Sequence, residues 1–216
     1  MLQHLAVIFL LLACISAQTA NPTTPSAPPQ PLIILIGPPL SGKTTFAEEI
    51  VDTYGIPSIS IEELIRDNAV ELDRLRGQGV SLAEMRYDPA MSRFLRQRLK
   101  TADLSHGIVL DGYPATLVQA EDLAKMFADS KLQLIALQLQ VPDETIRKRA
   151  KTTGRQSDKP EIIEQRIKDY HREMDAISFY FPKAKIVGID GSHSEAQTWK
   201  EIQTALNDAG VKPATK

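Results

Sequence analysis

The chain has 216 residues, of which 43% are hydrophobic and 24% are charged, with 25 Lys and Arg against 27 Asp and Glu. This composition fits one soluble domain, or one domain with a short appendage, and excludes collagen-like, coiled-coil and disordered chains. The net charge of −2 gives no overall positive field, so we expect no nucleic-acid partner. A single cysteine excludes a disulfide framework and a cysteine-rich zinc site.

The first 30 residues carry no Asp, Glu, Lys or Arg, and Leu5–Ala17 is an apolar run of 13 residues. A membrane-spanning helix needs about 20 residues, so this run is too short to cross a bilayer but fits the core of a secretory signal peptide. Ala17 or Ala20 would precede the cleavage site. We therefore expect residues 1–17 to be a leader and the protein to be exported, either periplasmic or secreted. The lack of basic residues near Met1 argues against a signal peptide, which usually begins with a basic region. If the leader is misassigned, the protein would be cytoplasmic.

The segment Leu11–Cys14 offers a second interpretation of the leader, because it resembles the lipobox of bacterial lipoproteins. The one cysteine of the chain stands where that box requires it, so a lipid on Cys14 is the single membrane attachment that we expect. The alternative is that Cys14 is a small apolar residue in a signal-peptide core. Residues 18–31 contain five prolines, which is typical of an extended, semi-rigid linker. The folded domain is therefore expected over residues 32–216.

Strand and helix patterns alternate along the predicted domain. Short apolar runs predict strands over Leu32–Ile36, Pro57–Ile61, Gly107–Leu110, Leu132–Val141 and Lys185–Ile189. The segments between them predict helices over Gly42–Tyr54, Asp88–Thr101, Thr116–Ala128, Pro142–Ala150, Pro160–Phe179 and Ser194–Leu206. This alternation predicts an α/β fold with a five-stranded parallel sheet between two layers of helices.

The strongest chemical signal follows the first predicted strand. Residues Gly37–Thr44 read GPPLSGKT and satisfy the phosphate-loop pattern G-x-x-x-x-G-K-[ST]. The glycines allow a tight turn and a close approach to an anion, and the loop amides and the helix start would cradle phosphates. Lys43 would neutralise the β- and γ-phosphates, and Thr44 would offer its hydroxyl to Mg²⁺. A chance Gly/Pro-rich turn is the alternative, but the strand, the spacing, the Lys and the Thr all favour the phosphate loop.

A second signal stands at the end of the third predicted strand, where Asp111–Pro114 reads DGYP. The carboxylate of Asp111 would end a strand beside the phosphate-loop strand and could hold Mg²⁺, partly through water. Taken alone, an Asp-Gly pair is more often a simple turn. Next to a phosphate loop, the metal-binding interpretation is favoured.

Together these motifs resemble the adenylate kinase and nucleoside monophosphate kinase family from Leu32 to the C-terminus. The resemblance implies a P-loop fold with a small helical region for the acceptor, and ATP as phosphoryl donor with Mg²⁺. It implies ATP contacts at Gly37, Pro38, Pro39, Leu40, Ser41, Gly42, Lys43, Thr44, Thr45, Arg149 and Ser192. It implies acceptor contacts at Ser60, Arg66, Gly112, Tyr113, Gln119, Arg155 and Arg166. Lys43, Arg149, Arg155 and Arg166 would be catalytic. Only four residues separate Ala150 from Arg155, so the lid would be short and unable to bind zinc.

Several positions depart from the family pattern. The family has Gly where this chain has Leu40 and Thr44, and Thr-Gly where it has Ile61-Glu62. An arginine that contacts the acceptor phosphate is replaced by Ala115. Losing such a charge-assisted contact typically costs about 1.5–3 kcal/mol, or about a tenfold to hundredfold loss in binding or rate. A lid arginine is replaced by Thr153, for which Lys151 substitutes only in part because it lacks the planar fork.

Three functions therefore remain open from the sequence. The first is reversible phosphoryl transfer from ATP to a nucleoside monophosphate, with AMP the favoured acceptor, by a monomeric enzyme. The second is a nucleotide-binding protein of the same fold with weakened transfer activity, which the residues at positions 115 and 153 suggest. The third is a P-loop kinase for a different small acceptor. The reaction needs no general base, because the attacking phosphate oxygen is already ionised at pH 7, so catalysis would rest on positioning and charge neutralisation.

Overall fold

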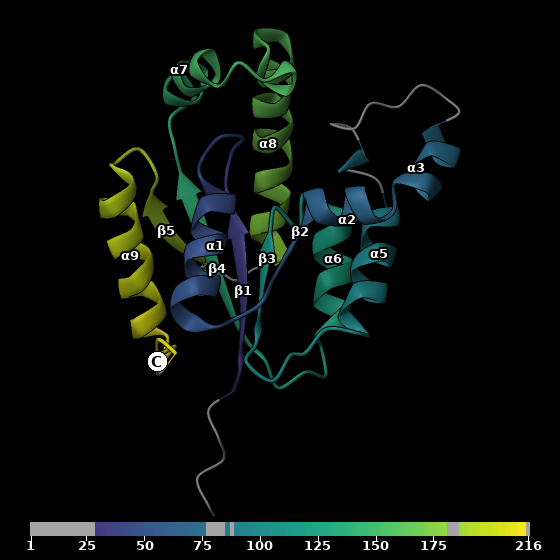
Figure 1. The fold of residues 1–216 in the computed structure, drawn as a ribbon, viewed down its shortest axis with the longest axis vertical. Coiled ribbons are helices and arrows are strands. Elements are labelled where there is room, and N and C mark those ends of the chain that lie inside the picture. The colour runs from purple at the N-terminus through teal and green to yellow at the C-terminus, as the bar shows by residue number, and fades with distance from the viewer. Residues whose placement is uncertain (1–28, 77–84, 87–88, 181–185, 215–216) are drawn as a thin grey trace, which may run out of the picture.

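A computed structural model of the chain describes residues 29–76, 85–86, 89–180 and 186–214. Its centre is a sheet of five parallel strands in the order β2-β3-β1-β4-β5 (Figure 1). The strands are β1 Pro31–Ile36, β2 Ser58–Ser60, β3 Ile108–Asp111, β4 Gln133–Gln140 and β5 Ile186–Asp190. The chain enters the domain at the amino end of β1, the central strand, and every carboxyl end lies at the opposite edge of the sheet.

Both faces of the sheet are covered, as a parallel sheet requires. Side chains of β1 alternate between two cores, with Ile33 and Leu35 in one and Leu32, Ile34 and Ile36 in the other. The first core is closed by α1 Lys43–Tyr54 and α9 Glu195–Asp208. The second is closed by α2 Ile61–Asp67, α3 Ala69–Arg76, α5 Ala90–Leu99, α6 Leu117–Met126 and α8 Pro160–Tyr180. The predicted fold, a five-stranded parallel sheet between two helical layers, is confirmed.

The short lid lies above the carboxyl edge of the sheet, where α7 Asp143–Thr153 connects to α8 through residues 154–159 (Figure 1). This connection contains only one turn of 3₁₀ helix, Gln156–Asp158. A small third core joins α7 to α8 through Ile146, Ile163 and Ile167, and Leu40 of the phosphate loop packs against it. The lid is therefore short, as the sequence predicts.

The predicted element boundaries were wrong at β2 and at the helix before β3. Ile61 does not end the second strand, because Ser60 caps α2: its Oγ accepts from the Glu63 amide and the Glu63 carboxylate accepts from the Ser60 amide, both at 3.0 Å. This reciprocal cap stops the strand and starts a helix. The helix predicted over Asp88–Thr101 begins at Ala90 and ends at Leu99. Asp88 and Lys185 lie outside the described residues.

Among the helices that the structure describes, none is long and apolar enough to cross a membrane. The predicted leader, the possible lipid site at Cys14 and most of the proline-rich linker lie outside the described residues, so these remain predictions.

Candidate active site

The loop between β1 and α1 has the geometry of a phosphate cradle. A Cβ on Gly37 would lie 2.8 Å from the Ser41 Oγ and 3.0 Å from the Leu139 carbonyl oxygen, so only glycine fits there. Gly42 has a φ of 96°, in the region where a side chain is strained, and it caps the start of α1. The loop thus leads directly into a helix N-terminus, where backbone amides and the helix dipole favour an anion.

Lys43 folds back over this loop. Its Nζ donates to the carbonyl oxygens of Gly37 and Pro38 at 2.9 and 2.8 Å, and to the Ser41 Oγ at 3.3 Å. Burial lowers the pKa of Lys43 from 10.5 to about 8, although the nearby Asp111 carboxylate acts in the opposite direction. The ammonium therefore stands where phosphate oxygens would bind, and an anion there would relieve its loss of hydration.

Asp111 ends β3 directly beside β1, in register with Leu35. The Thr44 hydroxyl donates to its Oδ2 at 2.7 Å, which confirms that the two predicted metal-binding residues lie together. Burial raises the pKa of the Asp111 carboxyl, and the hydrogen bond from Thr44 and the charge of Lys43 partly oppose this. No cluster of three His, Cys, Asp or Glu side chains suited to a metal occurs among the described residues. The pair nevertheless fits Mg²⁺, which is usually held by one or two protein oxygens together with substrate phosphates and water.

A cavity of about 1100 Å³ opens over the loop. Of the predicted site residues, it brings together Pro39–Thr45, Arg66, Asp111, Gly112, Arg155 and Arg166. Arg166 forms an ion pair with the buried Asp158 at 3.6 Å. Arg66, with a side chain 71% exposed, lies 3.9 Å from both Glu63 and Asp67. The cavity extends from the phosphate loop to α2 and the lid, and its size suits a nucleotide-sized ligand.

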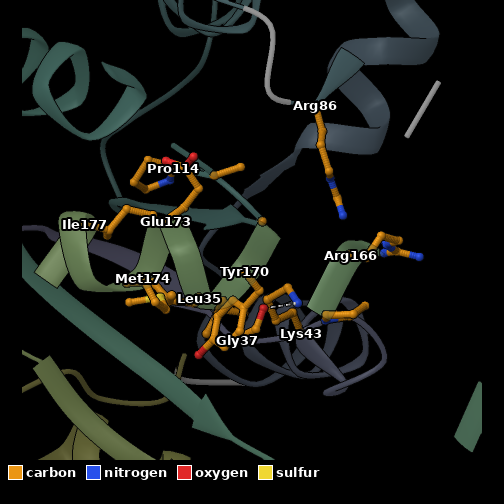
Figure 2. Close-up of a pocket in the computed structure, with 14 residues that line it drawn as sticks. Leu35, Gly37, Lys43, Arg86, Pro114, Arg166, Tyr170, Glu173, Met174 and Ile177 are labelled. Atoms are coloured by element: carbon orange, nitrogen blue, oxygen red, sulfur yellow. Dashed lines mark hydrogen bonds between the residues drawn. The ribbon is translucent and has the colours of Figure 1, made fainter. Parts of the chain in front are cut away.

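A smaller cavity of about 60 Å³ adjoins the first, and Gly37, Ala115 and Tyr170 are among its lining residues. Figure 2 shows the side chains around it, with Lys43, Arg86 and Arg166 coming from three different segments. These three cations also line the larger cavity. The two cavities therefore meet at a cluster of positive charge beside the phosphate loop.

Six predicted contact residues line neither cavity and have structural partners instead. The first is Pro38, whose carbonyl oxygen accepts from the Lys43 Nζ at 2.8 Å. Ser60 caps α2, and Ser192 donates from its amide and hydroxyl to Asp190. Tyr113 is 1% exposed and its hydroxyl shares a 2.9 Å hydrogen bond with Ser92, so its predicted acceptor contact stays a prediction. The remaining two are Gln119 and Arg149.

Gln119 is fully buried, with 0% of its surface exposed. Its Oε1 accepts from the Ala115 amide and its Nε2 donates to the Arg86 carbonyl oxygen, both at 2.8 Å. Arg149 donates to the carbonyl oxygens of Leu40 and Gly191 at 2.9 and 2.7 Å. In this structure Gln119 joins two backbone segments, and Arg149 braces the phosphate loop without lining the cavity.

Sequence reasoning missed Arg86 and Glu62 as cavity residues. Arg86 lies just before α5, and its guanidinium contacts the Glu62 carboxylate at 2.6 Å. Glu62 was noted only as a departure from a family pattern, and no motif includes Arg86. The 24-residue separation of this ion pair leaves no local sequence signal.

A large cavity over a phosphate loop, with a cation cluster at one end and a short lid above, is what a kinase of small phosphorylated acceptors requires. The sequence comparisons agree with that class: residues 35–186 match the family model described as adenylate kinase. This chain belongs to the adenylate kinase family.

Several curated relatives carry the same description. The adenylate kinase of Micrococcus luteus is 36% identical over 169 residues, which cover 74% of this chain and 82% of the relative. The adenylate kinase of Xanthomonas campestris pv. campestris is 34% identical over 185 residues, with coverages of 81% and 98%. That of Mesorhizobium japonicum is 30% identical over 192 residues, with coverages of 82% and 97%. The chain therefore spans most of the length of each relative.

Proposed function

We propose that this protein transfers the γ-phosphoryl group of ATP reversibly to AMP, forming two molecules of ADP. The observation that carries the proposal is the junction of two cavities beside a phosphate loop, with Lys43, Arg86 and Arg166 around it. A phosphoryl group in transfer carries spread negative charge, and preorganised cations stabilise it more strongly than water does. Family membership supports the choice of donor and acceptor.

Each side chain would have a task that follows from where it lies in the site. The loop amides from Pro39 to Thr45 would hold the donor phosphates, and Lys43 would exchange its carbonyl partners for phosphate oxygens. Arg155 and Arg166, at the lid and on α8, would neutralise charge on the moving group. Because the acceptor oxygen is already an anion, no side chain has to remove a proton. The lid excludes water and so favours transfer over hydrolysis.

Mg²⁺ fits this site as part of the nucleotide complex. Thr44 and Asp111 would hold it with their oxygens, directly or through water. When bound, the ion neutralises phosphate charge and orients the phosphate chain. Asp111 also orients the Thr44 hydroxyl, so the hydrogen bond between them fixes the position of this hydroxyl before the nucleotide binds.

A coupled assay on the purified protein tests the proposal, with ATP plus AMP, dAMP, CMP or UMP as acceptor. We expect turnover to be fastest with AMP. ATP binding without turnover on any nucleotide would instead support the weakened-activity alternative, which Ala115 and Thr153 suggest. Turnover only with an acceptor that is not a nucleotide would support the third function.

We also propose that the apolar leader directs the protein out of the cytoplasm, where it would act on scavenged nucleotides and run in the direction of two ADP to ATP and AMP. The support is the 13-residue apolar run and the proline-rich linker after it. Mass spectrometry of the mature N-terminus tests this. A start near Gln18 or Asn21, or a lipid on Cys14, is expected, and an intact Met1 would contradict export.

A further inference from the structure

The junction of the two cavities is an unusual place for three positive charges. Lys43, Arg86 and Arg166 all line both cavities. Cations that line the same cavity wall repel one another, so the cluster is stabilised when an anion enters it. The proposed mechanism gives Lys43 and Arg166 a task of their own, whereas it counts Arg86 only as a member of the positive cluster.

Arg86 is held with its guanidinium facing this junction. The side chain is only 15% exposed, and its Nη2 lies 3.8 Å from the position of a Cβ on Gly112, the residue after Asp111. Figure 2 shows it reaching from its own segment toward the region of Arg166 and Lys43. Ala115, which lines the smaller cavity on the same side, contributes no charge. The guanidinium at this wall therefore comes from position 86.

We propose that Arg86 binds the phosphate group of the acceptor nucleotide and supplies at this wall the charge that Ala115 does not. This inference rests on the proposed function for the identity of the acceptor. A guanidinium presents five N–H donors in a planar fork that matches a phosphate. It would face the acceptor phosphate from the side of Gly112, with Arg166 and Lys43 on the other sides.

Glu62 occupies the place of the phosphate before the acceptor binds. Its carboxylate contacts Arg86 Nη2 at 2.6 Å, yet 58% of the Glu62 side chain is exposed. Separating an exposed carboxylate from its partner costs little free energy, because water solvates the carboxylate and screens the pair. The acceptor phosphate, with more charge and more oxygens, therefore displaces Glu62 from the guanidinium.

Gln119 fixes the backbone from which Arg86 projects. Its amide group joins the Arg86 carbonyl oxygen to the Ala115 amide at 2.8 Å on each side. The segments that contain Arg86 and Ala115 are thereby held at a fixed distance from each other. Gln119 is accordingly a positioning residue for Arg86.

Isothermal titration with AMP and steady-state kinetics on Arg86→Ala test the proposal. We expect the Kd for AMP and the acceptor KM to rise 10- to 100-fold, while the KM for ATP changes less than twofold. Arg86→Lys, which keeps the charge but loses the fork, should fall between Arg86→Ala and wild type. Adding Ala115→Arg to Arg86→Ala should restore at least part of the AMP affinity. Unchanged AMP binding in both single variants would overturn the proposal.

Two matched variants separate binding from structure. Arg147→Ala breaks an ion pair of the same 2.6 Å length, to Glu164, away from both cavities, and should leave the Kd for AMP unchanged. Glu62→Gln breaks the Arg86 pair but frees the guanidinium, so AMP should bind more tightly. If Glu62→Gln instead loses as much AMP affinity as Arg86→Ala, the arginine has a structural role and the proposal fails.

The outcomes also separate this inference from the proposed function. Wild-type protein that binds AMP without turnover would refute the function and leave the Arg86 comparison to decide the inference. Wild-type turnover with an unaffected Arg86→Ala variant would refute the inference alone. Wild-type protein that binds no AMP would refute both.

Discussion

Arg149 of the lid helix α7 donates a 2.9 Å hydrogen bond to the carbonyl oxygen of Leu40 in the phosphate loop. Its second terminal nitrogen donates to Gly191, after β5, at 2.7 Å. One guanidinium thus joins three segments that are far apart in the sequence. The donor side of the site is braced by this side chain before any nucleotide enters.

Removal of this brace should weaken ATP binding more than AMP binding. Arg149→Ala loses two charge-assisted hydrogen bonds, each worth about 1.5–3 kcal/mol in typical cases, and leaves two carbonyl groups without a protein donor. We expect a KM for ATP raised about tenfold and a lower melting temperature. Arg149→Lys, which reaches only one carbonyl at a time, should be intermediate. A variant with wild-type stability and wild-type KM for ATP would contradict the positioning role.

The backbone conformation of Leu40 should lower the stability of the folded protein. It has a φ of 57°, which costs a non-glycine residue about 1–3 kcal/mol. Leu40→Ala and Leu40→Gly both lose the side-chain contacts with the third core, but only glycine relieves the strain. We therefore expect Leu40→Gly to be more stable than Leu40→Ala by about 1 kcal/mol, measured by chemical denaturation. At the exposed helical Lys200, the order should be reversed, with Gly less stable than Ala by about 1 kcal/mol.

The pH dependence of ATP use should follow Lys43. Its pKa of about 8 means that the free enzyme loses this positive charge as the pH rises above 8. The kcat/KM for ATP, which reports on the free enzyme, should then fall about tenfold per pH unit. Arg stays charged throughout this range, so Lys43→Arg should be slower but should lack this break. A break that persists in Lys43→Arg would assign it to another group.

The lowered pKa of Lys43 also makes the free energy of unfolding depend on pH. Between about pH 8 and pH 10.5 the folded chain holds fewer protons at Lys43 than the unfolded chain does. The contribution of Lys43 to the free energy of unfolding therefore rises with pH across that window and is unfavourable below it. Denaturation of wild type and Lys43→Met at pH 7 and pH 10 checks this sign, since the variant should lack the gain.

Asp111 should set the requirement for Mg²⁺. Asp111→Asn keeps an acceptor for the Thr44 hydroxyl but removes the negative charge that would hold the ion. We expect kcat to fall and the Mg²⁺ concentration for half-maximal rate to rise, each by about tenfold or more. Chelation with EDTA should abolish turnover in wild type. Asp208→Asn, at an exposed position on α9, is the control and should match wild type in Mg²⁺ titrations.

The fold was predictable because its signals are local. The all-apolar strand β1, the phosphate-loop spacing and the Asp-Gly pair after β3 each occupy a few consecutive residues, and parallel strand topology then places them together. The boundary at Ser60 was missed because its capping box starts a helix inside what looks like an apolar run. In that case a side-chain hydrogen bond decided the element, and hydrophobicity did not.

The sequence predicted the cavity-lining residues only where these residues are themselves part of a motif. Residues 39–45, Asp111 and the arginines at 155 and 166 line the larger cavity, as expected. Tyr113 and Gln119 were assigned by position in a motif, but burial and their own hydrogen bonds give them other partners. Arg86 was missed because tertiary folding brings it to the cavity, where its contact with Glu62 spans 24 residues of sequence and no spacing rule encodes it.

The entry of the chain at the amino end of β1 has a consequence for access. All five strands run in the same direction, so the start of β1 and the phosphate loop after β1, which lines the larger cavity, lie at opposite ends of the sheet (Figure 1). Anything joined upstream, whether a surface anchor or a fusion partner, is attached behind the domain. The phosphate loop and the lid then lie on the far side of the domain from the point of attachment.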